Sequence, residues 1–199
     1  MKNILLTQRQ DFESSRKEVR DSIDVAWHYL LQEIDILPIL IPNIFSEYKI
    51  LKNWIIKMKP DGIILSGGND IGERQLRDKT ETLLLDYAEE KQLPVFGVCR
   101  GMQLMIHRAG GNLIKIDNHV GQRHVINFTN TCDREVNSFH KYGYFNIPND
   151  YDIIAKSRDG SIECIIHKKL PWQAIMWHPE RENPFNLKDK NLISDCFGI

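Results

Sequence analysis

Residues 94–105 read PVFGVCRGMQLM, with one cysteine, Cys99, between two glycines. The apolar run at 94–98 predicts a buried strand, and the pattern at 100–107 predicts a helix that ends before Gly110. A residue on a tight strand-to-helix turn is in the arrangement called a nucleophile elbow, here with cysteine in place of serine. The stretch therefore predicts both an α/β fold and a reactive thiol.

Gly97 and Gly101 stand two residues either side of Cys99, where they let the strand and helix backbones approach closely. The N-terminus of the helix beneath the thiol supplies partial positive charge, which lowers the pKa of a cysteine. The alternative is a small core cysteine, because free cysteines are commonly buried. The glycine on each side favours the nucleophile.

The chain before this stretch alternates between apolar runs and helical periodicity. Strands are predicted from three apolar runs, at residues 3–7, 36–41 and 61–68. A first helix is predicted over 19–34, behind a Ser15–Glu18 capping box. A second is predicted after Ser46 as its cap, with one face formed by Leu51, Trp54, Ile55 and Met58. A third is predicted over 78–91. Such alternation builds βαβ units, so we expect an α/β fold with a mostly parallel sheet and helices on both faces.

The C-terminal half has an antiparallel character. HVINF (124–128) alternates, YDIIAKSRDGSIECIIH (151–167) predicts a hairpin that turns at Asp159-Gly160, and QAIMWHPE (173–180) predicts a strand that ends at His-Pro-Glu. There is no repeat, low-complexity linker or clear boundary. Residues 1–199 are therefore expected to form one domain.

The composition excludes several classes of function. A net charge of −1 gives no general basic field for nucleic acid or an anionic membrane. The longest apolar run, IDILPILI (34–41), is far shorter than the ~18 residues of a membrane-spanning helix. The four cysteines form no CxxC pair, so neither a disulfide framework nor a zinc site is expected. Reduced thiols are typical of the cytoplasm, and a cytoplasmic location is therefore expected.

Seven histidines could serve as the base, and His178 is favoured because W-H-P-E follows a predicted strand. Pro179 biases the residue before it towards extended geometry, in which residues i and i+2 share a face, so Glu180 can reach the His178 ring. Alone, His-Pro-Glu favours a proline turn with two solvated polar groups. Together with Cys99 it predicts a triad of nucleophile, base and orienting carboxylate.

An oxyanion hole needs two backbone N–H groups near the thiol. The N–H of Arg100, the next residue, is one natural donor, and Gly68 in LSGGND can supply the other because a glycine loop approaches substrate closely. An ordinary turn explains SGGN equally well when that segment is taken alone.

LSGG, GVCRGMQ and WHPE, in this order and spacing, resemble the class I glutamine amidotransferase and γ-glutamyl hydrolase (peptidase C26-type) superfamily over essentially the whole chain. The resemblance implies a flavodoxin-like fold and no cofactor. It also implies a cysteine that attacks a γ-glutamyl amide and forms a glutamyl thioester, which water hydrolyses. Carried over residue by residue, the implied roles are the Cys99–His178–Glu180 triad, oxyanion donors at Gly68 and Arg100, and a substrate pocket lined by Gln103, Asn137, Ser138, Phe139 and His140.

Arginine after the nucleophile resembles stand-alone γ-glutamyl amide hydrolases more than synthetase-coupled glutaminases. Members that act on γ-glutamyl polyamines or γ-glutamyl aminobutyrate commonly read NSxHHQ, whereas this chain reads NSFHKY at 137–142, which disfavours simple amine leaving groups. The sequence is more similar to members that hydrolyse γ-glutamyl-CDP-amidate in capsule phosphoramidate synthesis, so this substrate is favoured. The alternatives are a glutaminase subunit that hands ammonia to a separate synthetase, and a binding module that kept the elbow.

Residues at the carboxyl ends of the predicted strands are candidates for the leaving group, and arginine suits phosphate because its planar fork donates two hydrogen bonds. The candidates are Gln8, Arg9, Arg74, Arg77 and Lys141, each of which is also explained as a solvated surface residue. His119 and His124 have no acidic or thiol partner at ligand spacing, so a solvated loop and no metal site are expected there.

Overall fold

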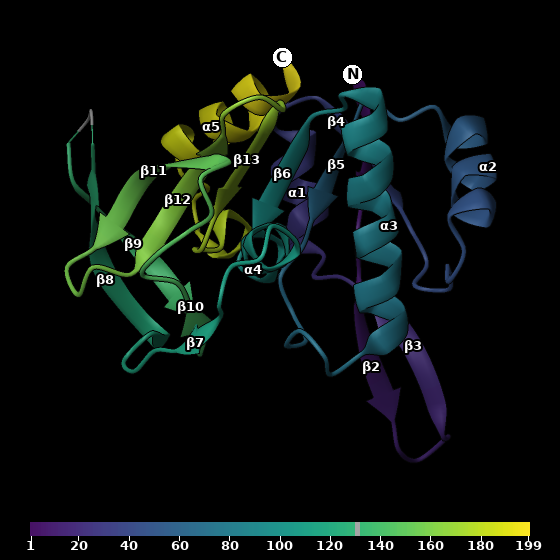
Figure 1. The fold of residues 1–199 in the computed structure, drawn as a ribbon, viewed down its shortest axis with the longest axis horizontal. Coiled ribbons are helices and arrows are strands. Elements are labelled where there is room, and N and C mark those ends of the chain that lie inside the picture. Colours follow the sequence, from purple (N-terminus) through teal and green to yellow (C-terminus); the bar gives the residue numbers. More distant parts are fainter. Residues whose placement is uncertain (130–131) are drawn as a thin grey trace.

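A nine-stranded sheet runs through the computed structural model, which describes residues 1–129 and 132–199. Its strand order is β4-β1-β5-β6-β13-β12-β11-β8-β9 (Figure 1). The strands are β1 Lys2–Leu6, β2 Arg9–Glu13, β3 Glu18–Ser22, β4 Ile36–Leu40, β5 Gly62–Leu65, β6 Val95–Val98, β7 Ile114–Lys115, β8 Val120–Phe128, β9 Arg134–Phe139, β10 Tyr142–Gly143, β11 Tyr151–Ser157, β12 Ile162–His167 and β13 Trp172–Ile175. The helices are α1 Ala26–Gln32, α2 Tyr48–Met58, α3 Gln75–Lys91, α4 Arg100–Arg108 and α5 Leu187–Phe197, with a 3₁₀ turn, η1, at Pro179–Arg181.

The sheet divides into a parallel and an antiparallel half. β4, β1, β5, β6 and β13 are parallel to one another. β12 pairs antiparallel with β13, and β11, β8 and β9 continue the antiparallel half. The prediction of an α/β fold with an antiparallel portion in the C-terminal half is confirmed, including the hairpin of β11 and β12 around Asp159-Gly160. β6 and β13 lie side by side and parallel, so the segments that follow them leave the same edge of the sheet.

Helices cover both faces of the sheet, and each face has its own apolar cluster. Helices α2, α3 and α4 lie on one face and helices α1 and α5 on the other (Figure 1). Side chains of the first group contribute to one cluster, and those of the second group contribute to the other. Alternation along β1 shows how a strand serves both clusters, because Leu5 packs into the first while Ile4 and Leu6 pack into the second. None of the helices in the described residues combines the length and apolarity that crossing a membrane would require.

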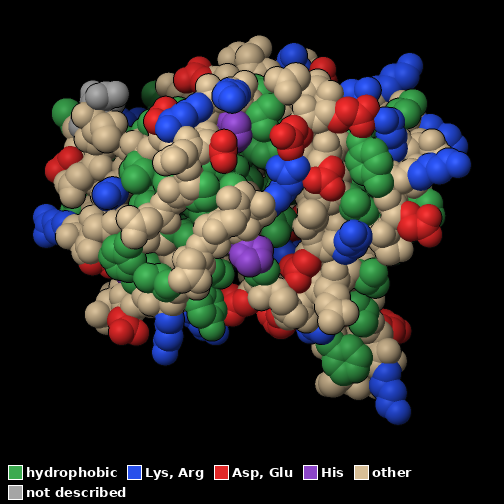
Figure 2. All heavy atoms as spheres, in the orientation of Figure 1, with side chains coloured by type: hydrophobic (Ala, Val, Ile, Leu, Met, Phe, Trp, Pro, Cys, Tyr) green, Lys and Arg blue, Asp and Glu red, His purple; other side chains and the backbone are tan. Residues whose placement is uncertain are grey.

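The prediction of a helix over 19–34 is wrong in its first part. Residues 9–22 form the antiparallel hairpin β2–β3, and α1 is only seven residues long. Ser15 caps no helix: its N–H and Oγ both donate to Glu13 Oε1, at 3.0 and 2.7 Å, within the turn. Val19 pairs across the hairpin with Phe12, and both side chains are exposed, at 60% and 53%. The hairpin projects from the body (Figure 1), and hydrophobic side chains lie on the surface of this projection (Figure 2).

Three predicted boundaries also shift. The N-cap of α2 is Glu47 and not Ser46. Helix α3 begins three residues before Asp78, whose Oδ2 accepts a hydrogen bond from the Gly72 N–H at 2.8 Å. β13 ends at Ile175, and Pro179 opens η1, so Trp-His-Pro-Glu lies beyond the strand.

Candidate functional site

Cys99 lies on a strained turn between β6 and α4. Its φ of 52° and ψ of −104° place a non-glycine residue in a region that L-amino acids rarely adopt. The turn is tight because α4 packs directly on β5: a Cβ added at Gly101 would lie 2.3 Å from the Leu65 carbonyl oxygen. The glycine at this position is therefore required by the close approach, and the thiol is held at the carboxyl edge of the sheet.

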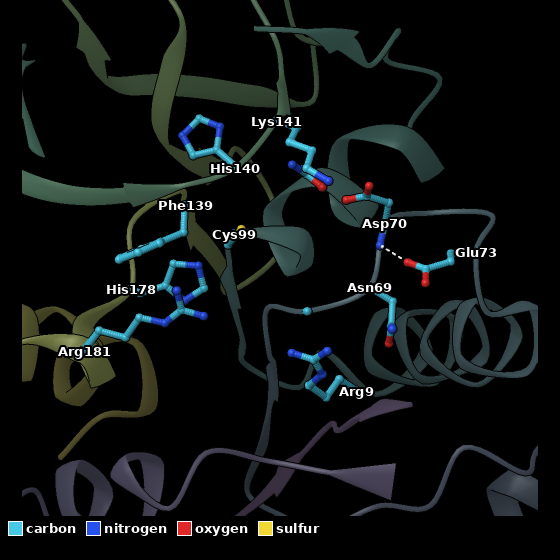
Figure 3. A pocket seen from close by; sticks show the side chains of 12 residues that line it. Arg9, Asn69, Asp70, Glu73, Cys99, Phe139, His140, Lys141, His178 and Arg181 are labelled. Carbon is cyan, nitrogen blue, oxygen red and sulfur yellow. Dashed lines mark hydrogen bonds between the residues drawn. The ribbon is translucent and has the colours of Figure 1, made fainter. Parts of the chain in front are cut away.

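His178 and Glu180 meet Cys99 at that edge. The His178 Nδ1 and Glu180 Oε1 atoms are 2.7 Å apart, and both side chains are buried. A Cβ added at Gly67 would lie 2.6 Å from His178 Cε1 and 3.6 Å from Cys99 Cβ, so both side chains crowd the same glycine. Cys99 and His178 line one cavity together (Figure 3).

The charges of this cluster favour an ion pair between thiolate and imidazolium. Burial raises the pKa of the Cys99 thiol, but the charge of His178 and a hydrogen bond to it lower the pKa further, so the net shift is downward. Burial lowers the pKa of His178, but Glu180 and then Cys99 raise it to about 9. The electrostatics of the cluster therefore favour a thiolate next to a protonated ring.

The glycine loop after β5 is held by a buried arginine. Gly68 has a φ of +119°, and a Cβ there would lie 2.7 Å from Arg77 Nη1. Arg77 Nη2 donates to the carbonyl oxygens of Ser66, at 2.9 Å, and Gly67, at 2.8 Å, and Nη1 donates to Asn69 Oδ1 at 3.2 Å. Arg77 is fully buried and lines neither cavity of the site, so it serves the loop and not a leaving group.

Two adjoining cavities of about 280 Å³ each meet at the glycine loop. The first contains the thiol and is lined by Arg9, Gly68, Asn69, Asp70, Glu73, Cys99, Gln103, Phe139, His140, Lys141, His178 and Arg181 (Figure 3). The second lies towards the base of the β2–β3 hairpin and is lined by residues that include Asp11, Ser22, Asp24 and Trp27. Arg9 and Arg181 line both cavities, so two guanidinium groups stand at the junction.

A family model described as "Glutamine amidotransferase class-I" matches residues 17–197. The chain belongs to the class-I glutamine amidotransferase family. It is 31% identical over 205 residues to a gamma-glutamyl-CDP-amidate hydrolase of Campylobacter jejuni, with 98% of this chain and 96% of that protein covered.

Two further relatives agree with this membership. The chain is 28% identical over 179 residues to a glutamine-hydrolyzing GMP synthase subunit of Methanococcus aeolicus, with 85% and 89% of the two chains covered. The crystal structure of a protein from Thermoplasma acidophilum, described as a GMP synthase subunit, superimposes with a TM-score of 0.74 at 19% identity and covers 100% of this chain and 93% of that one. This chain and the Thermoplasma acidophilum protein therefore share their fold at low sequence identity.

The amidotransferase cavity contains most, but not all, of the side chains that the sequence singled out. Gln103 lines it and donates from Nε2 to the Tyr142 carbonyl at 2.8 Å. Phe139 and His140 also line it. Asn137 and Ser138 do not: Asn137 binds the backbone of His178, and Ser138 Oγ donates to the His119 carbonyl at 2.7 Å.

The leaving-group candidates separate in the same way. Arg9 and Lys141 line the cavity of this amidotransferase. Gln8 is buried, and its Nε2 donates to the Ile41 carbonyl at 3.0 Å, while Arg74 lines neither cavity. Arg181 was missed, although it directly follows the His-Pro-Glu motif; its guanidinium lies 4.3 Å from the centre of the Phe139 ring.

His119 and His124 do not lie on a solvated loop as expected. His119 is 4% exposed, and Glu163, which no sequence spacing connects to it, lies beside both histidines. Only the pairing of β12 within the sheet brings this acid close, so the sequence carried no signal for it.

Proposed function

We propose that this amidotransferase is a cysteine-dependent hydrolase of a γ-glutamyl C–N bond, with γ-glutamyl-CDP-amidate as the favoured substrate. The observation that carries the proposal is the cluster of Cys99, His178 and Glu180, in which the His178–Glu180 contact of 2.7 Å leaves the other side of the ring for the thiol. The name of the Campylobacter jejuni relative, a gamma-glutamyl-CDP-amidate hydrolase, supports this class of bond.

In the proposed reaction the Cys99 thiolate attacks the γ-carbonyl carbon, and the negative charge that develops on the carbonyl oxygen is met by the N–H groups of Gly68 and Arg100. No described residue accepts a hydrogen bond from either N–H, which leaves both free for that oxygen. His178 gives its proton to the leaving nitrogen as the C–N bond breaks, and the glutamyl thioester remains. Water then attacks the thioester while His178 takes a proton from it, which releases glutamate and restores the thiolate.

Two arginines support a phosphorylated leaving group. Arg9 and Arg181 stand where the two cavities meet, so a substrate with its glutamyl end at Cys99 extends past both guanidinium groups towards the second cavity. Guanidinium groups bind phosphate oxygens by paired, charge-assisted hydrogen bonds. The products from γ-glutamyl-CDP-amidate are glutamate and cytidine diphosphoramidate.

The test is a glutamate-release assay over four substrates: glutamine, a γ-glutamyl peptide, a γ-glutamyl alkylamine and γ-glutamyl-CDP-amidate. We expect the last to have the highest kcat/KM and Cys99→Ala to abolish release while circular dichroism stays unchanged. Arg181→Gln should raise KM about 10–100-fold for γ-glutamyl-CDP-amidate and leave the KM for glutamine unchanged, because only the former places charge at the junction. Arg20→Gln, on the exposed hairpin, is the matched control. Equal, feeble rates on all four substrates would exclude the proposed substrate class.

The alternative is a glutaminase subunit that supplies ammonia to a separate synthetase, which the likeness to the GMP synthase subunit of Methanococcus aeolicus favours. This alternative predicts weak glutamine hydrolysis by the chain alone and a rise of about tenfold or more on addition of the synthetase. A rate on γ-glutamyl-CDP-amidate that needs no partner would count against it.

A further inference from the structure

Three buried side chains outside the proposed triad converge on one point. His119 stands immediately before β8, His140 immediately after β9, and Glu163 on β12. Their exposed fractions are 4%, 3% and 0%. His119 Nδ1 lies 3.2 Å from His140 Nε2 and 3.7 Å from Glu163 Oε1, and His140 Nε2 lies 3.5 Å from the same Glu163 oxygen. These three atoms, one from each side chain, therefore lie at the corners of a nearly equilateral triangle.

The size of this triangle matches the ligand shell of a transition metal ion. The circle through the three atoms has a radius of about 2.0 Å, which is the Zn–N and Zn–O bond length in proteins. An ion at or slightly above the centre reaches all three atoms without movement of the backbone. Two imidazoles and a carboxylate are also a donor set that zinc accepts.

The outer nitrogens of both rings are already used as donors. His119 Nε2 lies 3.0 Å from the Asp159 carboxylate, and His140 Nδ1 lies 3.1 Å from the Tyr142 carbonyl oxygen. Because both partners are acceptors only, each neutral ring carries its proton on that outer nitrogen. The inner nitrogens, 3.2 Å apart, then present lone pairs to each other and to Glu163. Such an arrangement is repulsive unless a proton or a metal ion lies between the three atoms, and the outer contacts are those that commonly orient metal-bound histidines.

The second oxygen of Glu163 gives an independent indication. Glu163 Oε2 and His124 Nε2 are buried and have no hydrogen-bond partner among the described residues. They lie 3.5 Å apart. In the described part of the chain no lysine or arginine pairs with Glu163, although a buried carboxylate without a cation is costly. A metal ion at the triangle supplies a balancing positive charge.

We propose that His119 Nδ1, His140 Nε2 and Glu163 Oε1 bind one Zn²⁺ ion, with water as the fourth ligand. The ion joins the start of β8, the end of β9 and β12, and so it fixes the wall of the cavity to which His140 belongs. Its role is structural, and the proposal is independent of the substrate that the Cys99 site hydrolyses.

The test is the binding of zinc alone to the full chain after treatment with a chelator. Cys99 and His178 can also bind zinc, so the titration against a chromophoric chelator is made with the wild type and with Cys99→Ser. We expect one tight Zn²⁺ per chain in Cys99→Ser and an affinity lowered at least about 100-fold by Glu163→Gln. Asp159→Asn removes the negative charge of the outer partner of His119 and keeps an oxygen for the Ser157 and Ser161 contacts, and it should lower the affinity about 10–100-fold. His28→Gln, an exposed histidine on α1, is the control and should change nothing.

Cobalt provides a readout that does not require the Glu163→Gln and Asp159→Asn variants to fold. Co²⁺ added to Cys99→Ser should give the visible absorption of a four-coordinate site without a sulfur-to-cobalt charge-transfer band. The proposal is overturned if chelator-treated protein binds no stoichiometric metal, which would mean that a shared proton fills the triangle. It is also overturned if tight binding disappears in Cys99→Ser, or if it persists undiminished in folded Glu163→Gln and Asp159→Asn.

Discussion

Cys99 and His178 lie close enough for each to shift the pKa of the other. Burial raises the pKa of Cys99, but the His178 charge lowers it to below its ordinary value, while Glu180 is the largest influence that raises the pKa of His178, to about 9. Both shifts favour the ionised thiol beside the protonated ring. Because the titrations of Cys99 and His178 are coupled, a substitution of Glu180 that changes the pKa of His178 also changes the ionisation of the Cys99 thiol.

We therefore predict a thiol that reacts with iodoacetamide well below the pH at which free cysteine does. Reactivity should persist above pH 9, whereas turnover should fall there, because His178 has lost the proton that the leaving nitrogen needs. Glu180→Gln keeps an acceptor for the ring but removes the charge, so the thiolate fraction and alkylation rate at neutral pH should drop about tenfold. The rates are measured in a Cys132→Ser background, because Cys132 is exposed and would react as well. Identical pH profiles for both proteins would contradict the argument.

Single residues were predictable from sequence where a short motif fixes the backbone around them. Gly97 and Gly101 indicated that Cys99 lies on a tight turn. Pro179 indicated that Glu180 can reach the His178 ring, and the His178 Nδ1 and Glu180 Oε1 atoms are 2.7 Å apart. Glu163 could not be found in this way, because its neighbours in space come from other strands. Contacts across a sheet depend on register, which no local pattern encodes.

At the scale of elements, a buried ionic cluster joins α3 to α4. Glu81 on α3 accepts from Arg77 Nε at 3.0 Å and from Arg100, which also pairs with Asp78. Burial raises the pKa of Glu81, but Arg100 and Arg77 lower it further, so the carboxylate stays charged. Arg77 holds the glycine loop after β5, and Arg100 directly follows Cys99. The Glu81 carboxylate, which binds both arginines, therefore helps to position the loop on one side of the cavity and the Cys99 turn on the other.

Glu81→Gln should therefore destabilise the protein by about 3–5 kcal/mol, since it leaves buried guanidinium charge without its partner. Urea unfolding is the measurement, and the expected result is a lower midpoint with an unchanged slope. Glu90→Gln on the same helix is the matched control, because Glu90 pairs with Lys52 at the exposed surface and its loss should matter little. If both variants unfold at the same urea concentration, the buried cluster contributes no special stability.

Elements were predictable where burial dictates the pattern. The strands of the parallel half read as continuous apolar runs because helices cover both faces, and α4 ends within one residue of its predicted end. The β2–β3 hairpin was not predictable from periodicity, because it projects from the body and neither face is buried in the core. Apolar residues on it, such as Val19, imitate the spacing of a helix.

At the scale of the whole molecule, the site lies where the two halves of the sheet meet. Cys99 and His178 follow the parallel strands β6 and β13, whereas Phe139 and His140 come from the end of β9 in the antiparallel half. The sequence placed its candidate residues at the carboxyl ends of the predicted strands. It did not show that β9, at the far edge of the sheet order, turns its end back onto the cavity.

Asn137 on β9 joins the halves, because its Oδ1 accepts from the His178 N–H at 2.9 Å and its Nδ2 donates to the His178 carbonyl at 2.8 Å. We predict that Asn137 acts by positioning His178, so Asn137→Ala should lower kcat about 10–100-fold with little change in KM. Asn137→Asp, which keeps the acceptor, should recover part of that loss. Asn127→Ala, at an exposed position on β8, is the control. The opposite pattern, a raised KM at unchanged kcat, would mean that Asn137 contacts the substrate, as the family resemblance implies.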